Sequence, residues 1–222
     1  MNRTILALAL SGCIACTPTQ ETKAPEGQGT FVSMADVDPS ILVEARYDSE
    51  HNFMGTRVRG YNAPKCLLTR PAAQALANVQ AELRLMGLSL KVYDCYRPQR
   101  AVDHFVAWAK DVNDLKMKRE FYPQVDKSNL FRDGYIAEKS GHTRGSTVDL
   151  TIDGLDFGTE FDLFDPLSHT ANPTVNTPQR ANRALLKAVM DKHGFKGIKT
   201  EWWHFTLRNE PFPNTYFDVP VE

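Results

Sequence analysis

The chain has 222 residues, of which 42% are hydrophobic and 10% aromatic, and its formal net charge at pH 7 is −1. This length predicts one folded domain, with ample apolar material for a core. The near-neutral balance, with no run of lysine or arginine, argues against a nucleic-acid partner.

The start of the chain predicts export. Arg3 precedes a short apolar run from Ile5 to Leu10, followed by small residues. This run is far too short for a permanent membrane span and is typical of a secretory signal. The motif LSGC, which ends at Cys13, resembles the bacterial lipobox, in which the cysteine becomes lipidated. An ordinary signal, cut nearby after Ala15, is the alternative.

Three segments follow from this interpretation. Residues 1–12 are the signal peptide, residues 13–30 a flexible tether that begins at the lipidated Cys13, and residues 31–222 the folded domain. The tether contains glycine, proline and polar residues with almost no large apolar side chains, so it cannot bury enough surface to fold. A lipid on Cys13 would anchor the protein to the membrane, and we expect an exported, periplasmic location.

Within the domain, the sequence predicts helices that alternate with strands. Apolar residues at helical spacing predict helices over residues 69–87, 98–109 and 177–194, the first closed by Gly87. Alternation and β-branched or aromatic residues predict strands over residues 89–95, 146–152 and 202–207, the first of them half-buried. An α+β domain is expected, with a small, mostly antiparallel sheet flanked by helices. A doubly wound parallel fold is disfavoured because no glycine-rich phosphate loop follows a strand.

Two cysteines lie inside the domain, Cys66 and Cys95. An exported protein folds in an oxidising compartment, where these two could form a disulfide. The alternative is a pair of buried free thiols, because the sequence alone does not show whether their Cα atoms approach each other.

Two segments carry the chemistry, SGHTRGSTVD from Ser140 to Asp149 and EWWH from Glu201 to His204. They supply His142, Asp149 and His204, three ligands of the types that zinc accepts. Three protein ligands leave a fourth position open for water, as in catalytic zinc sites. Glu201 stands beside the last ligand and could take the proton of that water. The pattern predicts a hydrolase with one zinc ion at the sheet.

The spacing of these residues predicts their local structure. His142 and Asp149 are seven residues apart, an odd interval that would put them on opposite faces of one continuous strand. Gly145 lies between them and can supply a turn, so we expect His142 on a loop and Asp149 on a strand. Glu201 and His204 are three apart, so Glu201 should precede the last strand, or the strand should bend there.

The two segments, together with YDCYRPQRAV before them, closely resemble the zinc D-alanyl-D-alanine dipeptidases of the VanX type. The resemblance runs from about Val43 to the C-terminal NTYFDVPV. It implies the fold shared by D-Ala-D-Ala peptidases and the Hedgehog signalling domain. It also implies a small D,D-dipeptide as substrate. The loop between Asp149 and Asp162 is shorter than in some members, which bears on how strictly dipeptides are selected.

The resemblance implies a role for each matching residue. His142, Asp149 and His204 would hold zinc, and Glu201 would be the general base and later acid. Arg97 would stabilise the charge that develops on the attacked carbonyl. Apart from the resemblance, Asp94 lies near Arg97 in the sequence and could support it as a partner. Three further residues match substrate-binding positions: Asp162, which would receive the substrate ammonium, and Tyr47 and Ser140, which would donate or accept hydrogen bonds around the dipeptide.

Two other functions share these motifs. A D,D-carboxypeptidase or endopeptidase that acts on longer muropeptides would use the same zinc chemistry. A non-catalytic zinc-binding module of the same fold would need the three ligands but neither Glu201 nor Arg97. The presence of both residues favours an enzyme.

Overall fold

The computed structural model describes Met1 and residues 30–222. The predicted signal peptide, the lipidation at Cys13 and the predicted tether up to residue 29 lie outside these residues. No helix within residues 30–222 combines the length and the apolar character that crossing a membrane would require.

Three long helices form where the sequence predicts them. Their apolar faces are buried, and each start carries a proline, which lacks the amide hydrogen that the first helical turn leaves unpaired. The third also has a capping box between Asn176 and Gln179. Gly87 closes the first, and the amide of Leu88 donates to the carbonyl of Leu83. The helices are α1 (Met34–Val37), α2 (Arg70–Leu85), α3 (Gln99–Lys110), α4 (Lys118–Phe121) and α5 (Thr177–Lys192).

A five-stranded sheet forms the centre of the domain, with the strand order β2-β4-β5-β7-β6. All neighbouring pairs are antiparallel except β2 with β4, so the prediction of a mostly antiparallel sheet is confirmed. A two-stranded sheet pairs β1 with β3. The strands are β1 (Phe31–Ser33), β2 (Leu42–Val43), β3 (Leu67–Thr69), β4 (Leu90–Asp94), β5 (Thr147–Ile152), β6 (Phe195–Gly197) and β7 (His204–Leu207).

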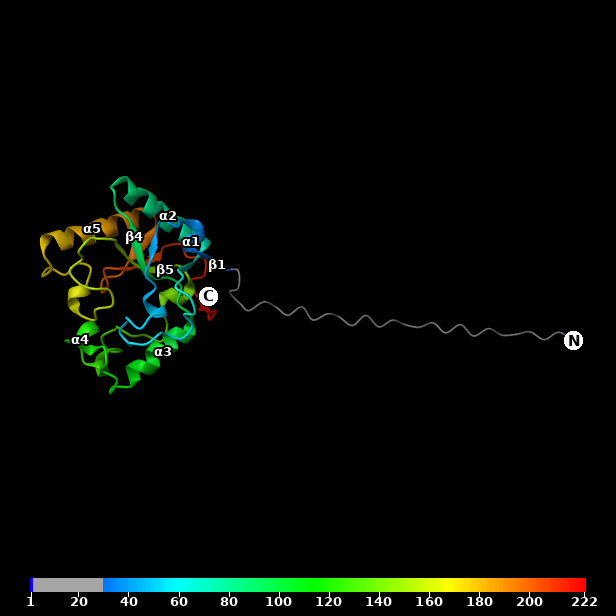
Figure 1. Ribbon diagram of the computed structural model, residues 1–222, viewed down its shortest axis with the longest axis horizontal. Coiled ribbons are helices and arrows are strands. Elements are labelled where there is room, and N and C mark those ends of the chain that lie inside the picture. The colour runs from blue at the N-terminus through cyan, green and yellow to red at the C-terminus, as the bar shows by residue number, and fades with distance from the viewer. Residues whose placement is uncertain (2–29) are drawn as a thin grey trace.

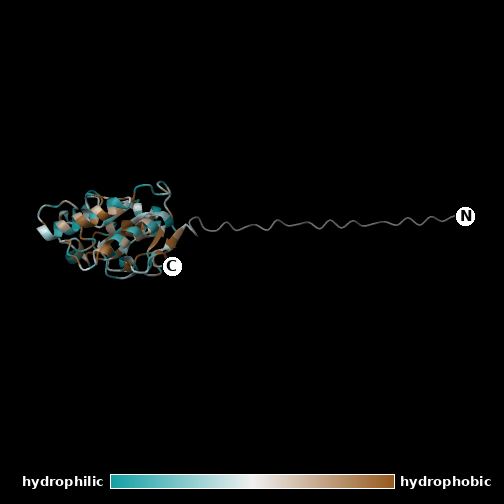
Figure 2. Cartoon of the chain, turned by 90° about the horizontal axis from the view of Figure 1, so that it is seen from above, coloured by the Kyte–Doolittle hydropathy of each residue, from teal (hydrophilic) through white to brown (hydrophobic). Residues whose placement is uncertain are grey.

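Helices cover the sheet from two sides. Figure 1 shows α2 and α5 together on one side of β4 and β5, and α3 and α4 on the other. Hydrophobic and hydrophilic residues are interleaved along the helices, as amphipathic packing requires (Figure 2). The central strand β5 is buried at every position. A side chain on β5 is therefore held by packing on both faces, which makes this strand a rigid support for a site.

Three details differ from the sequence predictions. Strand β4 is not half-buried, because Tyr93 packs against Phe161 and is only 7% exposed. The first long helix ends at Leu85, before the predicted end at residue 87, and Met86 lies outside it and is 48% exposed. The last strand begins at His204, and the two preceding tryptophans are buried outside it. In each case tertiary packing decides what a short local pattern leaves open.

Candidate active site and metal centre

Three side chains from three neighbouring strands form one row across the sheet. Asp149 on β5 lies opposite Asp94 on β4 and opposite His204 on β7. The register between β4 and β5 shifts between Val92 and Asp94, which is an irregularity of the β-bulge kind. This shift brings the two aspartates level with each other. Adjacent like charges repel, so this arrangement needs cations nearby.

His142 reaches the same place from a short 3-10 helix, η3 (Gly141–Arg144). The hydroxyl of Ser140 accepts a hydrogen bond from the backbone amide of His142 at 3.2 Å and so caps the start of η3. Gly145 ends it with φ at +79°, in the left-handed region that favours glycine. His142 therefore lies on a turn and Asp149 on a strand, as the odd spacing predicts.

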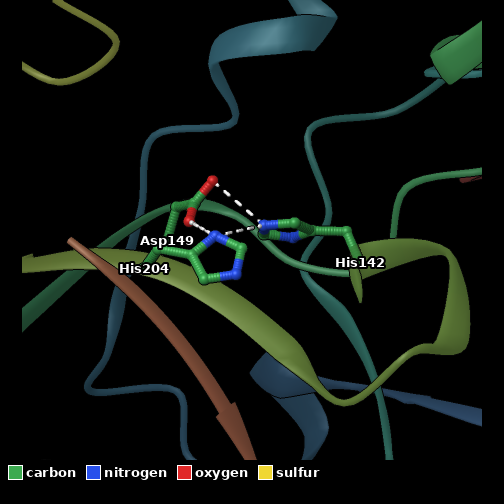
Figure 3. A group of neighbouring side chains, drawn as sticks. All are labelled: His142, Asp149 and His204. Carbon is green, nitrogen blue, oxygen red and sulfur yellow. Dashed lines mark hydrogen bonds and ion pairs between the residues drawn. The ribbon is translucent and has the colours of Figure 1, made fainter. Parts of the chain in front are cut away.

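His142, Asp149 and His204 converge on one point (Figure 3). The Nε2 atom of His142 lies 3.2 Å from Oδ2 of Asp149 and 3.2 Å from Nδ1 of His204. The same Nδ1 lies 3.0 Å from Oδ1 of Asp149. One potential ligand atom from each residue lies within 4.8 Å of the other two. Two imidazoles and a carboxylate in this arrangement can hold a divalent metal ion on one side.

The hydrogen bonds around the three residues fit a metal. The Nδ1 atom of His142 lies 2.7 Å from the carbonyl oxygen of Cys95. A carbonyl only accepts, so Nδ1 carries the proton and Nε2 presents a lone pair to the centre. Oδ1 of Asp149 is buried, and it lies beside Nδ1 of His204, which is itself a candidate ligand atom. Burial would raise the pKa of Asp149, but His142 and His204 outweigh it and hold the pKa below its ordinary value. A cation would satisfy these converging electron pairs.

Glu201 precedes β7 and turns toward the same centre. Its Oε2 atom lies 3.5 Å from Nδ1 of His204. Desolvation, assisted by the charge of Asp149, raises the pKa of Glu201 above its ordinary value and outweighs the opposing effect of His204. A carboxylate with a raised pKa beside a metal centre is suited to accept a proton near neutral pH.

Arg97 follows β4 and holds the two aspartates together. Its Nη2 atom lies 2.9 Å from Oδ2 of Asp94 and 3.7 Å from Oδ2 of Asp149, and its Nε donates to Asp94 at 3.0 Å. Its guanidinium stands 5.1 Å from the ring centre of Tyr47 and 5.0 Å from that of Phe105. These contacts hold the positively charged guanidinium in one position beside the three candidate metal ligands.

Asp162 and Tyr47 lie in the same site, with the Tyr47 ring next to Arg97. The hydroxyl of Tyr47 donates to Oδ2 of Asp162 at 2.8 Å. Burial, and after it the charge of Asp149, raise the pKa of Asp162 well above the usual carboxyl range. Asp162 is the one non-glycine residue with a positive φ, 63°, among the described residues. Such strain is typical of functional positions, where the fold holds a side chain in one direction.

All eight predicted catalytic, metal and substrate residues line one cavity of about 240 Å³. It is smaller than the roughly 300–1,000 Å³ of common ligand pockets, so it suits a small molecule. The eight residues are Tyr47, Arg97, Ser140, His142, Asp149, Asp162, Glu201 and His204.

The sequence reasoning missed two supports of this site. The hydroxyl of Tyr61 donates to Oδ1 of Asp94 at 2.7 Å, so the aspartate that holds Arg97 is itself held. The carbonyl of Cys95 orients His142. A backbone acceptor leaves no trace in a sequence, and Tyr61 reaches Asp94 only because distant segments pack together.

Cys66 and Cys95 are joined by a disulfide, with their Cα atoms 5.2 Å apart. The bridge links the residue before β3 to the residue after β4. The bridge lies next to the metal centre, because the backbone carbonyl of Cys95 also accepts the hydrogen bond from His142.

Comparison with known proteins places the chain in a family. A model of the D-ala-D-ala dipeptidase family matches residues 28–222. D-alanyl-D-alanine dipeptidases from Streptomyces coelicolor and Enterococcus faecium are 39% and 35% identical, over 87% and 86% of this chain and 98% of each relative. The Escherichia coli enzyme is 34% identical, over 80% of this chain and 84% of its own.

Among solved structures, the vancomycin-resistance D,D-pentapeptidase VanY in complex with Zn(II) aligns with a TM-score of 0.42 and 16% identity. The alignment covers 67% of this chain and 77% of that one. The family model spans the whole described domain, and the sequence relatives match along most of their own length. The chain therefore belongs to the D-ala-D-ala dipeptidase family.

Proposed function

We propose that this protein is a zinc-dependent peptidase that hydrolyses the free dipeptide D-alanyl-D-alanine to two molecules of D-alanine. The observation that carries this proposal is that one small cavity gathers all the groups the reaction needs. A candidate metal centre, a carboxylate base, a fixed arginine and a buried aspartate line it together. Membership of a metal-dependent family whose curated relatives are named D-alanyl-D-alanine dipeptidases supports it.

His142, Asp149 and His204 would hold one zinc ion. When bound, zinc supplies Lewis acidity toward a carbonyl oxygen and makes water acidic enough to react near neutral pH. Glu201 lies close enough to the ligand His204 to take a proton from the attacking water. The same carboxyl can then deliver that proton to the amine that leaves.

Arg97 would stabilise the transition state. The attacked carbonyl oxygen gains negative charge as the tetrahedral intermediate forms, and a fixed guanidinium favours that state over the neutral substrate. Asp94 and the Tyr47 and Phe105 rings keep the guanidinium in place without a rearrangement during the reaction. Losing one such group typically lowers turnover by about 10²–10³-fold.

Asp162, Tyr47 and Ser140 would bind the substrate. A free dipeptide carries an ammonium and a carboxylate, so its site needs an anion at one end and donors at the other. Asp162 would supply the anion, because a bound ammonium favours the ionised form of this buried carboxyl. Its hydrogen bond from Tyr47 fixes its direction. Ser140 lines the same cavity beside the metal turn. A cavity of about 240 Å³ leaves little room for a third residue.

We further propose that the protein works outside the cytoplasm, as a periplasmic lipoprotein anchored through Cys13. The signal-like N-terminal sequence supports this proposal. The Cys66–Cys95 disulfide supports it too, since such bridges persist in oxidising compartments.

The test is release of free D-alanine by the zinc-loaded protein from D-Ala-D-Ala, with the N-acylated dipeptide run in parallel. Turnover of the free dipeptide alone is expected, because the acyl group removes the ammonium that Asp162 would bind. Cleavage of the acylated substrate as well would indicate a carboxypeptidase or endopeptidase. If neither is cleaved while zinc is bound, the protein is a binding module and the proposal is wrong.

A further inference from the structure

A second, larger cavity lies outside the active site. It is a groove of about 950 Å³, lined by α5, by the segment that precedes α5 and by the end of β6 with the turn after it. We call it the basic groove. It shares Ile198 with the active-site cavity, but none of the eight candidate site residues lines it.

Among the charged side chains of the lining, cations outnumber carboxylates. Asp191 is the one carboxylate among the lining residues, and it pairs with Lys187 and with Arg208, the latter at 3.0 Å. The chain as a whole has a formal net charge of −1, so this concentration of cations is local. The six cationic side chains of the groove are Arg180, Arg183, Lys187, Lys196, Lys199 and Arg208.

The buried side chain of Arg183 is an observation, independent of the exposed cations, that points to an anionic ligand in the groove. Its side chain belongs to the lining, yet the residue is only 2% exposed. Its Nε donates to the carbonyl of Phe157 at 2.7 Å and its Nη1 to that of His169 at 2.8 Å. Its Nη2 is buried without a partner, and within residues 30–222 it forms no ion pair. A buried cation without a counter-ion is costly unless something supplies the opposite charge.

Three further cations of the groove are also free of carboxylate partners within the described residues. Arg180 donates to the Pro173 carbonyl at 3.3 Å, to that of Val175 and to the hydroxyl of Thr177 at 3.0 Å. Lys196 and Lys199 are exposed and form no ion pair there. Two arginines and two lysines thus line one groove without a carboxylate of residues 30–222 at ion-pair distance.

We propose that the basic groove is an anion-binding site that takes a phosphate ester. Guanidinium and ammonium groups together recognise tetrahedral oxyanions through charge-assisted hydrogen bonds. A groove of about 950 Å³ is larger than a bare phosphate needs, so the phosphate is carried on a larger group. The ligand is either a soluble molecule or the headgroup of an anionic lipid. Both carry the phosphate ester that the cations of the groove would bind.

The first experiment measures binding of glycerol 3-phosphate to the full chain by calorimetry, in low-salt buffer without phosphate. The double variant K196Q/K199Q is compared with K65Q/K110Q, which removes two exposed lysines outside the groove. Affinity should fall by about tenfold or more in K196Q/K199Q and stay unchanged in K65Q/K110Q. Both variants should keep wild-type thermal denaturation, since all four lysines are exposed. Equal affinities in the two variants would overturn the proposal.

The second experiment separates the two sources of phosphate. All proteins carry Cys13→Ser, so that no acyl chain on this residue tethers them, and are sedimented with vesicles of phosphatidylglycerol and phosphatidylcholine. Vesicle binding that K196Q/K199Q abolishes supports the site and assigns it to a lipid headgroup. Glycerol 3-phosphate binding without vesicle binding supports the site and assigns it to a soluble ester. If the wild type binds neither probe, the groove is not a phosphate site.

Discussion

Four carboxyl groups share the active-site region, and their surroundings push their pKa values apart. Burial raises the pKa of Asp94, Asp162 and Glu201. At Asp149 the two histidines outweigh burial and lower the pKa. A carboxylate that stays ionised suits a metal ligand, whereas one that gains a proton more readily suits acid–base work. The division of roles between Asp149 and Glu201 therefore follows from their positions.

Replacing Glu201 by glutamine should remove the base and leave the metal site intact. We expect turnover of D-Ala-D-Ala to fall by about 10²–10⁴-fold, the usual contribution of a general base. Zinc content, measured by atomic absorption, should remain near one per chain, because the three ligands are unchanged. Glu160→Gln is the matched control, since Glu160 is exposed and lines a different cavity. Substantial residual activity in Glu201→Gln would show that another group takes the proton.

Asp162→Asn should weaken binding of the substrate while the backbone keeps its conformation. Asparagine also tolerates a positive φ, so the backbone can stay as it is. KM for the free dipeptide should rise strongly, because an amide cannot pair with the substrate ammonium. A weak effect on KM would place the ammonium elsewhere.

The same variant makes a prediction about pH and stability, for protein freed of metal by a chelator. The folded-state pKa of Asp162 is raised, so folding favours its protonated form. The native protein therefore loses stability as pH rises from the ordinary carboxyl pKa to the raised one. Asp162→Asn has no such proton to lose, so its stability relative to the native protein should increase across that range. Urea unfolding at a series of pH values measures this difference; a constant difference would contradict the assignment.

Among elements, the turn η3 depends on one glycine. A Cβ atom built on Gly145 would stand 2.2 Å from Cε1 of Phe31 on β1, and its φ is +79°. The N-terminal strand therefore packs directly under the turn that presents His142. Any side chain at this position must displace either the strand or the turn.

Gly145→Ala should therefore weaken both the fold and the metal site. Gly87→Ala is the matched control, because its φ of +72° imposes the same backbone strain but, apart from its chain neighbours, no atom of residues 30–222 lies within 4 Å of the new Cβ. The control should lose about 1–2 kcal/mol of unfolding free energy and keep its zinc affinity. Gly145→Ala should lose more stability and also bind zinc more weakly in a competition assay with a chromophoric chelator. Equal losses in the two variants would mean that strain alone matters.

The sequence predicts the long elements better than the short ones. Helices α2, α3 and α5 span enough turns to show a periodic pattern, and turn and cap residues mark their starts. Strands β2 and β6 have two and three residues, too few for an alternating pattern. The register shift before Asp94 has no signature in the local sequence, although it sets Asp94 opposite Asp149.

At the scale of the whole molecule, the site gathers residues from distant parts of the chain. The motifs around His142 and His204 indicate a metal centre because their residue types are rare in such spacing. Tyr47 and Asp162, 115 residues apart, meet only through the packing of loops around the sheet. The resemblance predicts both as substrate-binding residues, but no local pattern predicts the hydrogen bond between them. For Tyr61, neither the motifs used for the family resemblance nor a local pattern predicted a role in the site.

The disulfide should stabilise the molecule as a whole. It closes a segment with a sequence separation of 29, which corresponds to about 3–4 kcal/mol from restriction of the unfolded chain. We expect the double variant Cys66→Ala/Cys95→Ala to lose that amount in urea unfolding. Zinc affinity should fall too, because the bridge holds the backbone of residue 95, whose carbonyl orients His142. A variant that keeps wild-type stability would show that the bridge contributes little.

The central sheet ends on both sides in very short strands. Edge strands expose unpaired backbone groups that can recruit a second chain and start aggregation. Here β2 offers two residues and β6 three, and β6 carries the exposed Lys196. Neither edge provides the length of flat, uncharged backbone that fibril growth needs. Folded molecules at high local concentration should therefore not pair through their sheet edges, and their cavities should stay open to small solutes.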